Sequence, residues 1–387
     1  MRNVVADYIN LAHDIAEKNE LRQVALDKLF GLSHRIELLP GPKGLQRVTQ
    51  GSELPPVPAF DSLREAYEAF TGDPDVLKLG RATQSYSNFN FPKALANTVN
   101  GLLVKAYGGA DYRWQEIVTS TTLVENFKTL ERVRVNFIPD LEEVPEDYPY
   151  DAVTDHGDEG FTYAITSLGG LLPITRRAIL ANNIQGIQRA VEQMARAAAR
   201  TLAKRCWNKV IENRVYGVDG LPMFHGDHAN LGSAALSVAA LNAARLALFA
   251  QTEPGSSERL GLSGPFLLAV PIELEATARE INNCQHIPGS ATEANPWYQR
   301  FGAGGERIFA NPLFTDAAAN WYLFDISQKV GILEVGFLFG IQLPQFVLED
   351  DPRRNPTLSQ DGIVYKIRHE YECAIEDYRG SYKAVVT

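Results

Sequence analysis

Apolar and polar positions follow a helical spacing along residues 186–214, a stretch with no proline and a single glycine at its first position. Apolar side chains recur every three or four residues and so form one face of a helix. These side chains are Ile187, Val191, Met194, Ala198 and Leu202. At about 1.5 Å per residue the helix would be roughly 40 Å long, with Arg196 facing solvent. Alone, this pattern fits either a core helix of a large α/β domain or a spine that carries separate lobes.

Residues 1–80 have the pattern of a small helical arm. Apolar residues recur at helical spacing up to Gly31, and a second, shorter helical pattern follows Asp61. Between them, residues 40–60 are rich in proline, glycine and polar side chains, which is a linker composition. We therefore expect an extension that is weakly attached to the rest of the chain. It fits a removable or guiding segment and an ordinary helical extension equally well.

Two strand-like segments bracket an acidic stretch. Val133 and Val135 alternate with polar residues before it, and Phe161, Tyr163 and Ile165 share one face after it. Residues 139–160 carry nine carboxylates and no lysine or arginine. The pattern predicts a long hairpin, which is marginally stable alone in water and needs a surface to rest on, such as a neighbouring subunit. A solvated acidic loop is the alternative.

The second half of the chain mixes helical and strand patterns. A helical pattern at 236–251 precedes a short buried strand, a second helix and further strands. This order predicts an α/β lobe inserted after the long helix, and the whole chain is expected to be of the α+β class. The last segment alternates Ile363, Tyr365 and Ile367 with charged residues, which predicts a long strand packed on the helix at 186–214.

Composition narrows the functional classes. The chain has 387 residues and a formal net charge of −10, which argues against a sequence-wide basic surface for nucleic acid. No run of eighteen apolar residues occurs, so no membrane contact is expected. The three cysteines, Cys206, Cys284 and Cys373, are far apart and odd in number, which indicates a reducing compartment and buried thiols.

Candidate chemistry is limited to one turn-rich passage. His225, Asp227 and His228 lie close together, but this spacing on a glycine-containing loop is not that of a zinc-binding helix. No nucleophile elbow or phosphate-binding loop occurs. We expect a turn held by side-chain hydrogen bonds, no catalytic, cofactor-binding or metal-binding residues, and no enzymatic activity. A soluble metal-dependent hydrolase that uses these three residues remains the alternative.

Several segments together resemble tailed-phage major capsid proteins of the HK97 fold, in the group of Mu-type head proteins. No single segment is specific, but their order and spacing are. The resemblance covers Ser85 to Val386 and leaves out residues 1–80. Its segments are SYSNFNFPKALANTVNGLLVKAY from Ser85, NFKTLERVRV from Asn126, LEEVPEDYPY from Leu141, YAITSLGGLLPITRRAILANN from Tyr163, DGLPMFHGDHANL from Asp219 and IVYKIRHEYECAIEDYRGSYKA from Ile363.

The resemblance implies a division of the chain into capsid domains. The implied parts are a helical N-terminal extension (1–80), an N-arm (81–127), a projecting hairpin or E-loop (128–168), a peripheral domain (169–230) with the spine helix at 186–214, an inserted axial domain (231–335), and peripheral return strands (336–387) with a turn at 349–356. Subunit contacts are expected at the hairpin tip and at this turn, whose mixed charge suits pairing between symmetry mates. The candidate contact residues are Glu142, Glu143, Glu146, Asp147, Tyr148, Tyr150, Asp350, Asp351, Arg353 and Arg354.

The implied function is that of a major head protein of a tailed double-stranded DNA phage or prophage. Such a protein assembles with itself into the hexamers and pentamers of an icosahedral shell and belongs to the virion, after assembly in the host cytoplasm. Portal, scaffold or prohead protease and auxiliary head proteins are the implied partners, and the genome is enclosed rather than specifically bound. An encapsulin-like nanocompartment shell is the alternative.

One departure concerns covalent cross-linking. The founding member of the family joins its subunits through a lysine of the hairpin. Here no lysine occurs between Lys128 and Lys204. We therefore expect no isopeptide bond from the projecting part of the hairpin, about Val133 to Ile165.

Overall fold

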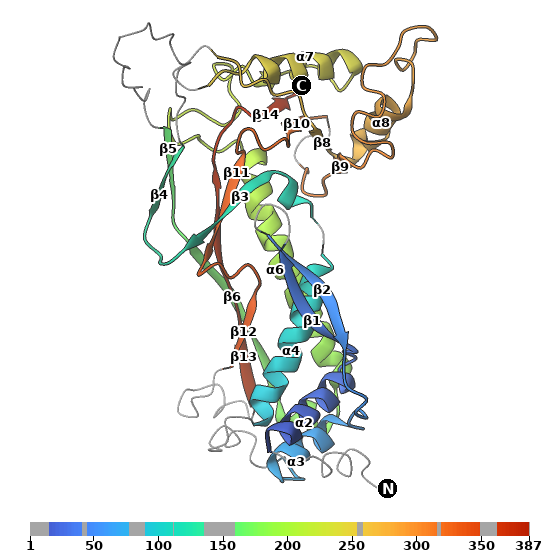
Figure 1. Ribbon diagram of the computed structural model, residues 1–387, viewed down its shortest axis with the longest axis vertical. Helices are drawn as coiled ribbons and strands as arrows, with labels where there is room; N and C mark the ends of the chain where they lie inside the picture. The colour runs from blue at the N-terminus through green and yellow to red at the C-terminus, as the bar shows by residue number, and fades with distance from the viewer. Residues whose placement is uncertain are drawn as a thin grey trace, which may run out of the picture. The chain divides into compact units, whose positions relative to one another are not determined.

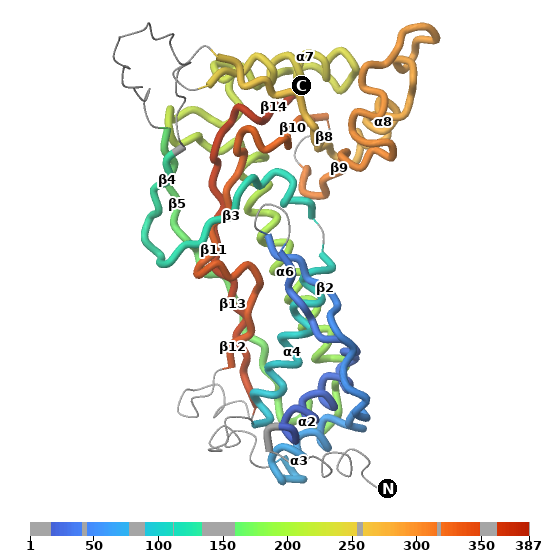
Figure 2. Tube along the Cα trace, viewed as in Figure 1, coloured from blue at the N-terminus to red at the C-terminus, as the bar shows by residue number. Residues whose placement is uncertain are grey.

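The computed structural model describes residues 15–40, 45–76, 90–110, 112–134, 159–253, 258–315, 319–348 and 362–386 (Figures 1 and 2). The chain divides into two compact units. Unit 1 comprises Met1–Asp111, Thr166–Thr201 and Ile341–Glu370, and unit 2 comprises Tyr112–Ile165, Leu202–Gly340 and Tyr371–Thr387. Helix α6 (Ile184–Ile211) and strand β13 (Gly362–Ile375) each contribute one part to either unit.

Among the described residues, unit 1 contains four helices and the first part of α6. The four are α2 (Ile15–Leu29), α3 (Leu63–Thr71), α4 (Phe91–Gly108) and α5 (Arg176–Leu180). Their ends follow local capping rules. The Asn90 side chain accepts a hydrogen bond from the Lys93 backbone N–H at the start of α4, with a proline in the first turn. Ser62 caps α3 in the same way, and Gly72 closes it with a φ of 68°.

The strands of unit 1 form a hairpin and part of a larger sheet. β1 (His34–Pro40) pairs antiparallel with β2 (Gln46–Glu53), and α4 packs against both (Figure 1). β6 (Thr166–Thr175) and β12 (Gln345–Leu348) pair with β13. Gly169 lies so close to the Ile367 carbonyl oxygen that any side chain at this position would clash with it. A glycine here therefore permits the close pairing of β6 with the first part of β13.

The predicted weakly attached arm is wrong for the described part of residues 1–80. β1 and β2 replace much of the predicted linker at 40–60, and Leu54, Val57 and Phe60 are buried in the unit 1 core. The same core contains Phe30 of the first segment and Leu95 of α4. The apolar residues that follow β2 reach a core whose other members are distant in sequence.

Helix α6 begins and ends two to three residues earlier than the predicted helix at 186–214. Ile187, Val191 and Leu202 are buried and Arg196 is exposed. Met194 and Ala198, expected within the buried stripe, are half-buried, and Ala195 and Ala199 are buried instead. In the first half of the helix the buried positions are four residues apart. The prediction assumed a mixture of three- and four-residue steps, so it placed Met194 and Ala198 one position away from the residues that are buried. In unit 1, Ile187, Val191 and Ala195 share a core with Ile363, Tyr365 and Ile367 of β13.

Unit 2 contains a five-stranded sheet in the order β7-β14-β10-β8-β9. Helix α7 (Val238–Ala250) packs against β14, and helix α8 (Ile272–Asn283) packs against β8 and β9 (Figure 1). The strands are β7 (Leu231–Gly232), β8 (Phe266–Val270), β9 (Ile308–Ala310), β10 (Trp321–Asp325) and β14 (Ser381–Ala384). The sheet therefore extends beyond the lobe expected at 231–335, because β14 from the end of the chain pairs between β7 and β10.

The remaining described strands of unit 2 form one ladder on the last part of β13 and a separate hairpin. β11 (Leu333–Leu338) pairs antiparallel with this part, and β3 (Val118–Val124) pairs parallel with β11. β4 (Leu130–Arg134) and β5 (Glu159–Tyr163) form a hairpin.

Cys206 and Cys373 are buried free thiols, and Cys284 is a half-buried one. The α+β class is confirmed, and among the described residues no helix is long and apolar enough to cross a membrane.

The buried face of α6 should not tolerate a charged side chain. We expect Ala195→Glu to destabilise the protein by about 3 kcal/mol or more, because it places an unpaired charge in the unit 1 core. Ala198→Glu should cost less, since Ala198 is half-buried. Arg196→Glu is the matched control on the exposed face. Urea unfolding of the soluble proteins measures the effect, and an Ala195→Glu variant as stable as the Arg196→Glu variant would contradict it.

His369 predicts a pH dependence of stability. Burial lowers its pKa to about 4, only partly opposed by the Gln342 carbonyl, whose oxygen lies 3.1 Å from Nε2. The ring is therefore neutral in the fold but charges near pH 6.5 when unfolded. The neutral ring's contribution to the free energy of unfolding is fully present above pH 6.5. As the pH falls towards 4, about 3 kcal/mol of this stability is lost.

The measurement compares wild type with His369→Gln, which keeps a neutral donor for the Gln342 carbonyl. The free energy of unfolding in urea is followed from pH 7.5 to 4.5. We expect the wild-type value to fall more steeply. Parallel curves for the two proteins would rule out this role of His369.

Candidate functional site: the base of the hairpin

The β4–β5 hairpin lies on an apolar cluster of its own unit. Leu130 pairs with Tyr163 and Arg134 with Glu159 at the two ends of the ladder. Phe161, Tyr163 and Ile165 are buried together with Val124, Leu338 and Ala374. The predicted common face of Phe161, Tyr163 and Ile165 is confirmed. This packing supplies the stability that a two-stranded hairpin lacks by itself.

Glu334 anchors one end of β5. This glutamate lies on β11 and is only 2% exposed. The Tyr163 hydroxyl donates a hydrogen bond to Glu334 Oε1 over 2.7 Å, and Arg132 Nε lies 3.1 Å from the same oxygen. Burial and the bond to Glu334 raise the pKa of Tyr163, so the hydroxyl stays a donor. A side chain at Gly336 would overlap the Tyr163 ring, so glycine makes room for this contact.

Arg379 anchors the other end of β5. Its side chain is 8% exposed and donates two parallel hydrogen bonds of 2.9 Å to the Glu159 carboxylate. It also lies 3.2 Å from the buried carboxylate of Asp377 and stacks on the Tyr378 ring. The Tyr216 hydroxyl donates to Glu159 Oε2 over 3.1 Å. Such two-point, charge-assisted contacts fix orientation as well as distance.

The charges of this second anchor depend on one another. Burial by itself lowers the pKa of Arg379, but the bonds to Glu159 and the charge of Asp377 outweigh it, so the pKa is raised. Burial raises the pKa of Tyr216, and the charges of Asp377 and Glu159 raise it further. Both shifts favour a charged arginine and a neutral tyrosine. Both anchors act mechanically, by holding the strand that returns from the acidic stretch.

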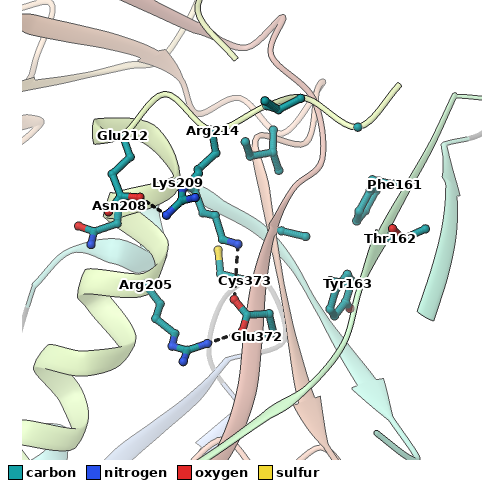
Figure 3. Close-up of a pocket in the computed structure, with 14 residues that line it drawn as sticks. Phe161, Thr162, Tyr163, Arg205, Asn208, Lys209, Glu212, Arg214, Glu372 and Cys373 are labelled. Atoms are coloured by element: carbon teal, nitrogen blue, oxygen red, sulfur yellow. Dashed lines mark hydrogen bonds and ion pairs between the residues drawn. The ribbon is translucent and has the colours of Figure 1, made fainter. Parts of the chain in front are cut away.

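A cavity of about 610 Å³ lies beside β5 (Figure 3). Phe161, Thr162 and Tyr163 line one side, and residues 372–375 of β13 line another. The end of α6 forms a further wall, from which Arg205 and Lys209 both reach the Glu372 carboxylate (Figure 3). The loop at 214–217 completes the lining. Cationic, anionic and apolar groups thus meet in one recess of unit 2.

The histidine turn has a structural role. Residues 226–229 form a turn. His228 is buried, with Nε2 2.7 Å from Asp219 Oδ2 and Nδ1 3.2 Å from the Met223 carbonyl oxygen, and it stacks on the Tyr378 ring. Asp227 donates its backbone N–H to the His225 ring instead of sharing a ligand set with it. Both nitrogens of His228 are therefore engaged by the protein, and no group of three or more metal-ligating side chains occurs among the described residues.

The ten predicted subunit-contact residues lie outside the described residues. They belong to the stretches at 135–158 and 349–361. Sequence reasoning missed the anchoring residues Glu159, Glu334, Asp377 and Arg379. One signal was available, because Glu334 interrupts the apolar run ILEVGFLFG, where an unpaired charge would be costly. Its partners could not be read from the sequence.

The chain is similar to known phage capsid proteins in sequence and in structure. A family model described as phage capsid protein matches residues 158–384. A search of curated proteins finds no match. Among solved structures, the procapsid of bacteriophage JBD30 is 12% identical, with 76% of this chain and 75% of that chain covered and a TM-score of 0.41.

Two further structures are similar at a comparable level. The capsid of an empty GTA particle is 12% identical, with 71% of this chain and 90% of that chain covered and a TM-score of 0.47. A virus-like particle from Pyrococcus furiosus is 13% identical, with 75% of this chain and 99% of that chain covered and a TM-score of 0.41.

The Arg379 anchor can be tested by removing its charge. We expect Arg379→Leu to lower the free energy of unfolding by about 3–5 kcal/mol, because Glu159 and Asp377 are left buried without their cation. Arg214→Leu removes an arginine from the exposed pair with Glu212 and should change stability by about 0.5 kcal/mol or less. Urea unfolding measures both. Similar losses in the two variants would show that the buried cluster does not hold the hairpin.

Proposed function

The chain belongs to the phage capsid protein family and acts as a major capsid protein of the virion, and we propose that it builds the icosahedral head of a tailed double-stranded DNA phage or prophage. In this proposal the subunit adopts the HK97 type of capsid fold and assembles into hexamers and pentamers. The observation that carries it is the family match, which spans residues 158–384, from β5 to β14. This range includes both partners of the Arg379–Glu159 anchor.

The proposed role of the hairpin is to carry the acidic stretch to a neighbouring subunit. A strand that transmits a contact between subunits has to be fixed in its own subunit, because a loose strand would lose conformational entropy on binding. The anchors at Glu159 and Tyr163 supply that rigidity. The contact residues proposed for this stretch are Glu142, Glu143, Glu146, Asp147, Tyr148 and Tyr150.

A second set of contacts is proposed at the turn of residues 349–356. Asp350 and Asp351 precede Arg353 and Arg354, so two copies related by symmetry could pair opposite charges. We assign residues 128–168 to the E-loop, 169–230 and 336–387 to the peripheral domain, and 231–335 to the axial domain. The strand β14, from the end of the chain, would then complete the axial sheet.

The genome is proposed to be enclosed without tight binding. A net charge of −10 disfavours strong attraction to DNA phosphates, and enclosure requires none. The subunit is a structural protein in this proposal, with assembly in the host cytoplasm. Portal, scaffold or prohead protease and auxiliary head proteins are its proposed partners.

Assembly of the purified full chain tests the proposal. We expect electron microscopy and analytical ultracentrifugation to show rings, capsomers or closed shells. Nuclease-protected DNA in particles from infected or induced cells would support genome enclosure, whereas protein cargo without DNA would favour a nanocompartment. A chain that remains monomeric at all concentrations would overturn the proposal.

A further inference from the structure

The cavity of unit 2 lies between two strand edges. β5 pairs with β4 along one edge, and the last part of β13 pairs with β11 along one edge. Among the described strands of unit 2, none pairs with the second edge of β5 or of Cys373–Ile375. Residues of both strands line the cavity (Figure 3). The recess therefore lies between the edges of two separate sheets.

The backbone of β13 presents hydrogen-bonding groups to this gap. The Glu376 N–H donates to the Ile332 carbonyl over 3.0 Å, and the register pairs Ile375 with Leu333 and Cys373 with Val335. In an antiparallel ladder, alternate residues direct their N–H and C=O groups to opposite edges. Cys373 and Ile375 consequently direct theirs away from β11. An exposed row of such groups is a template for an added strand.

The size of the gap suits a short extended segment. A volume of about 610 Å³ lies within the range of ligand sites, about 300–1,000 Å³. Phe161 and Tyr163 supply apolar walls, and the polar groups lie along the strand edges and the end of α6. Successive side chains of a strand point to opposite faces, so a strand in this gap could place apolar and polar side chains alternately against these walls.

The charge of the gap favours an acidic occupant. Arg205 and Lys209 share the single carboxylate of Glu372, which leaves one positive charge in excess on this wall. Arg214 pairs with Glu212 at the rim, so that pair adds no net charge. Within this chain, residues 139–158 are the complementary segment. Eight of these twenty residues are Asp or Glu and none is Lys or Arg.

We propose that this gap is a strand-insertion slot, in which an extended part of residues 139–158 from a second copy lies between β5 and β13. The inserted segment pairs with the backbone of Cys373 and Ile375, and one of its carboxylates binds Lys209. The inference rests on the proposed function, because assembly brings the second copy to the slot. It adds the site that receives the acidic segment. The base of the hairpin would then hold the acidic segment of its own chain and also bind the acidic segment of a second copy.

Site-specific photo-cross-linking in assembled particles tests the slot. The photoreactive residue p-benzoylphenylalanine replaces Val215, which is 59% exposed and lines the cavity. After irradiation we expect bands at multiples of the chain mass, with the cross-link mapped by mass spectrometry to residues 139–158. The same group at Leu246, which is 66% exposed on α7, is the control and should not label that segment. Labelling of another segment, or cross-links within one chain only, would overturn the proposal.

Reversing the charge of Lys209 tests whether the slot binds an acidic segment. Lys209→Glu should lower the cross-link yield from position 215 at least fivefold, whereas Arg189→Glu, an equal charge change on the exposed face of α6, should leave it unchanged. Equal effects of the two variants would indicate unspecific electrostatics and would contradict a slot at Lys209. Failure of the wild-type chain to assemble would refute the proposed function. Normal shells with cross-links elsewhere would refute the slot alone.

Discussion

The buried ion pair between Arg379 and Glu159 is the constraint on which the hairpin base depends. It joins residues 220 positions apart in the sequence, and Asp377 adds a second carboxylate to the same guanidinium. Charges this deeply buried are tolerated only when paired, so the pair admits few alternative positions of β5. The second anchor, at Glu334, fixes the other end of the strand through Tyr163. Together they turn a marginal two-stranded ribbon into a rigid part of unit 2.

This rigidity links the fold to assembly. A capsid subunit has to present its contact surfaces in one orientation, since each added freedom reduces the affinity of every contact in the shell. The anchors fix β5 while its second edge and that of Cys373–Ile375 stay unpaired among the described strands of the unit. The same charges that hold the hairpin thus fix one side of the gap between the two sheets, and the proposed insertion of an acidic segment uses the cationic end of α6.

Unit 1 shows how a segment that reads as a linker becomes part of a core. Leu54, Val57 and Phe60, which follow the β1–β2 hairpin, share a core with residues of the helices α2, α3 and α4. Burial of these residues in the same core as Ile187 and Tyr365 makes the N-terminal segment integral to the unit.

The sequence alone determined the elements whose signal is local. The spacing of apolar residues specified α6, and alternation specified the inward face of β5, because these periods follow from helix and strand geometry. The order of motifs also pointed to a phage capsid protein. The tertiary structure alone decided which alanines of α6 are buried, where β14 pairs, and that Arg379 meets Glu159. These outcomes depend on contacts between distant residues, whose energies no local pattern records.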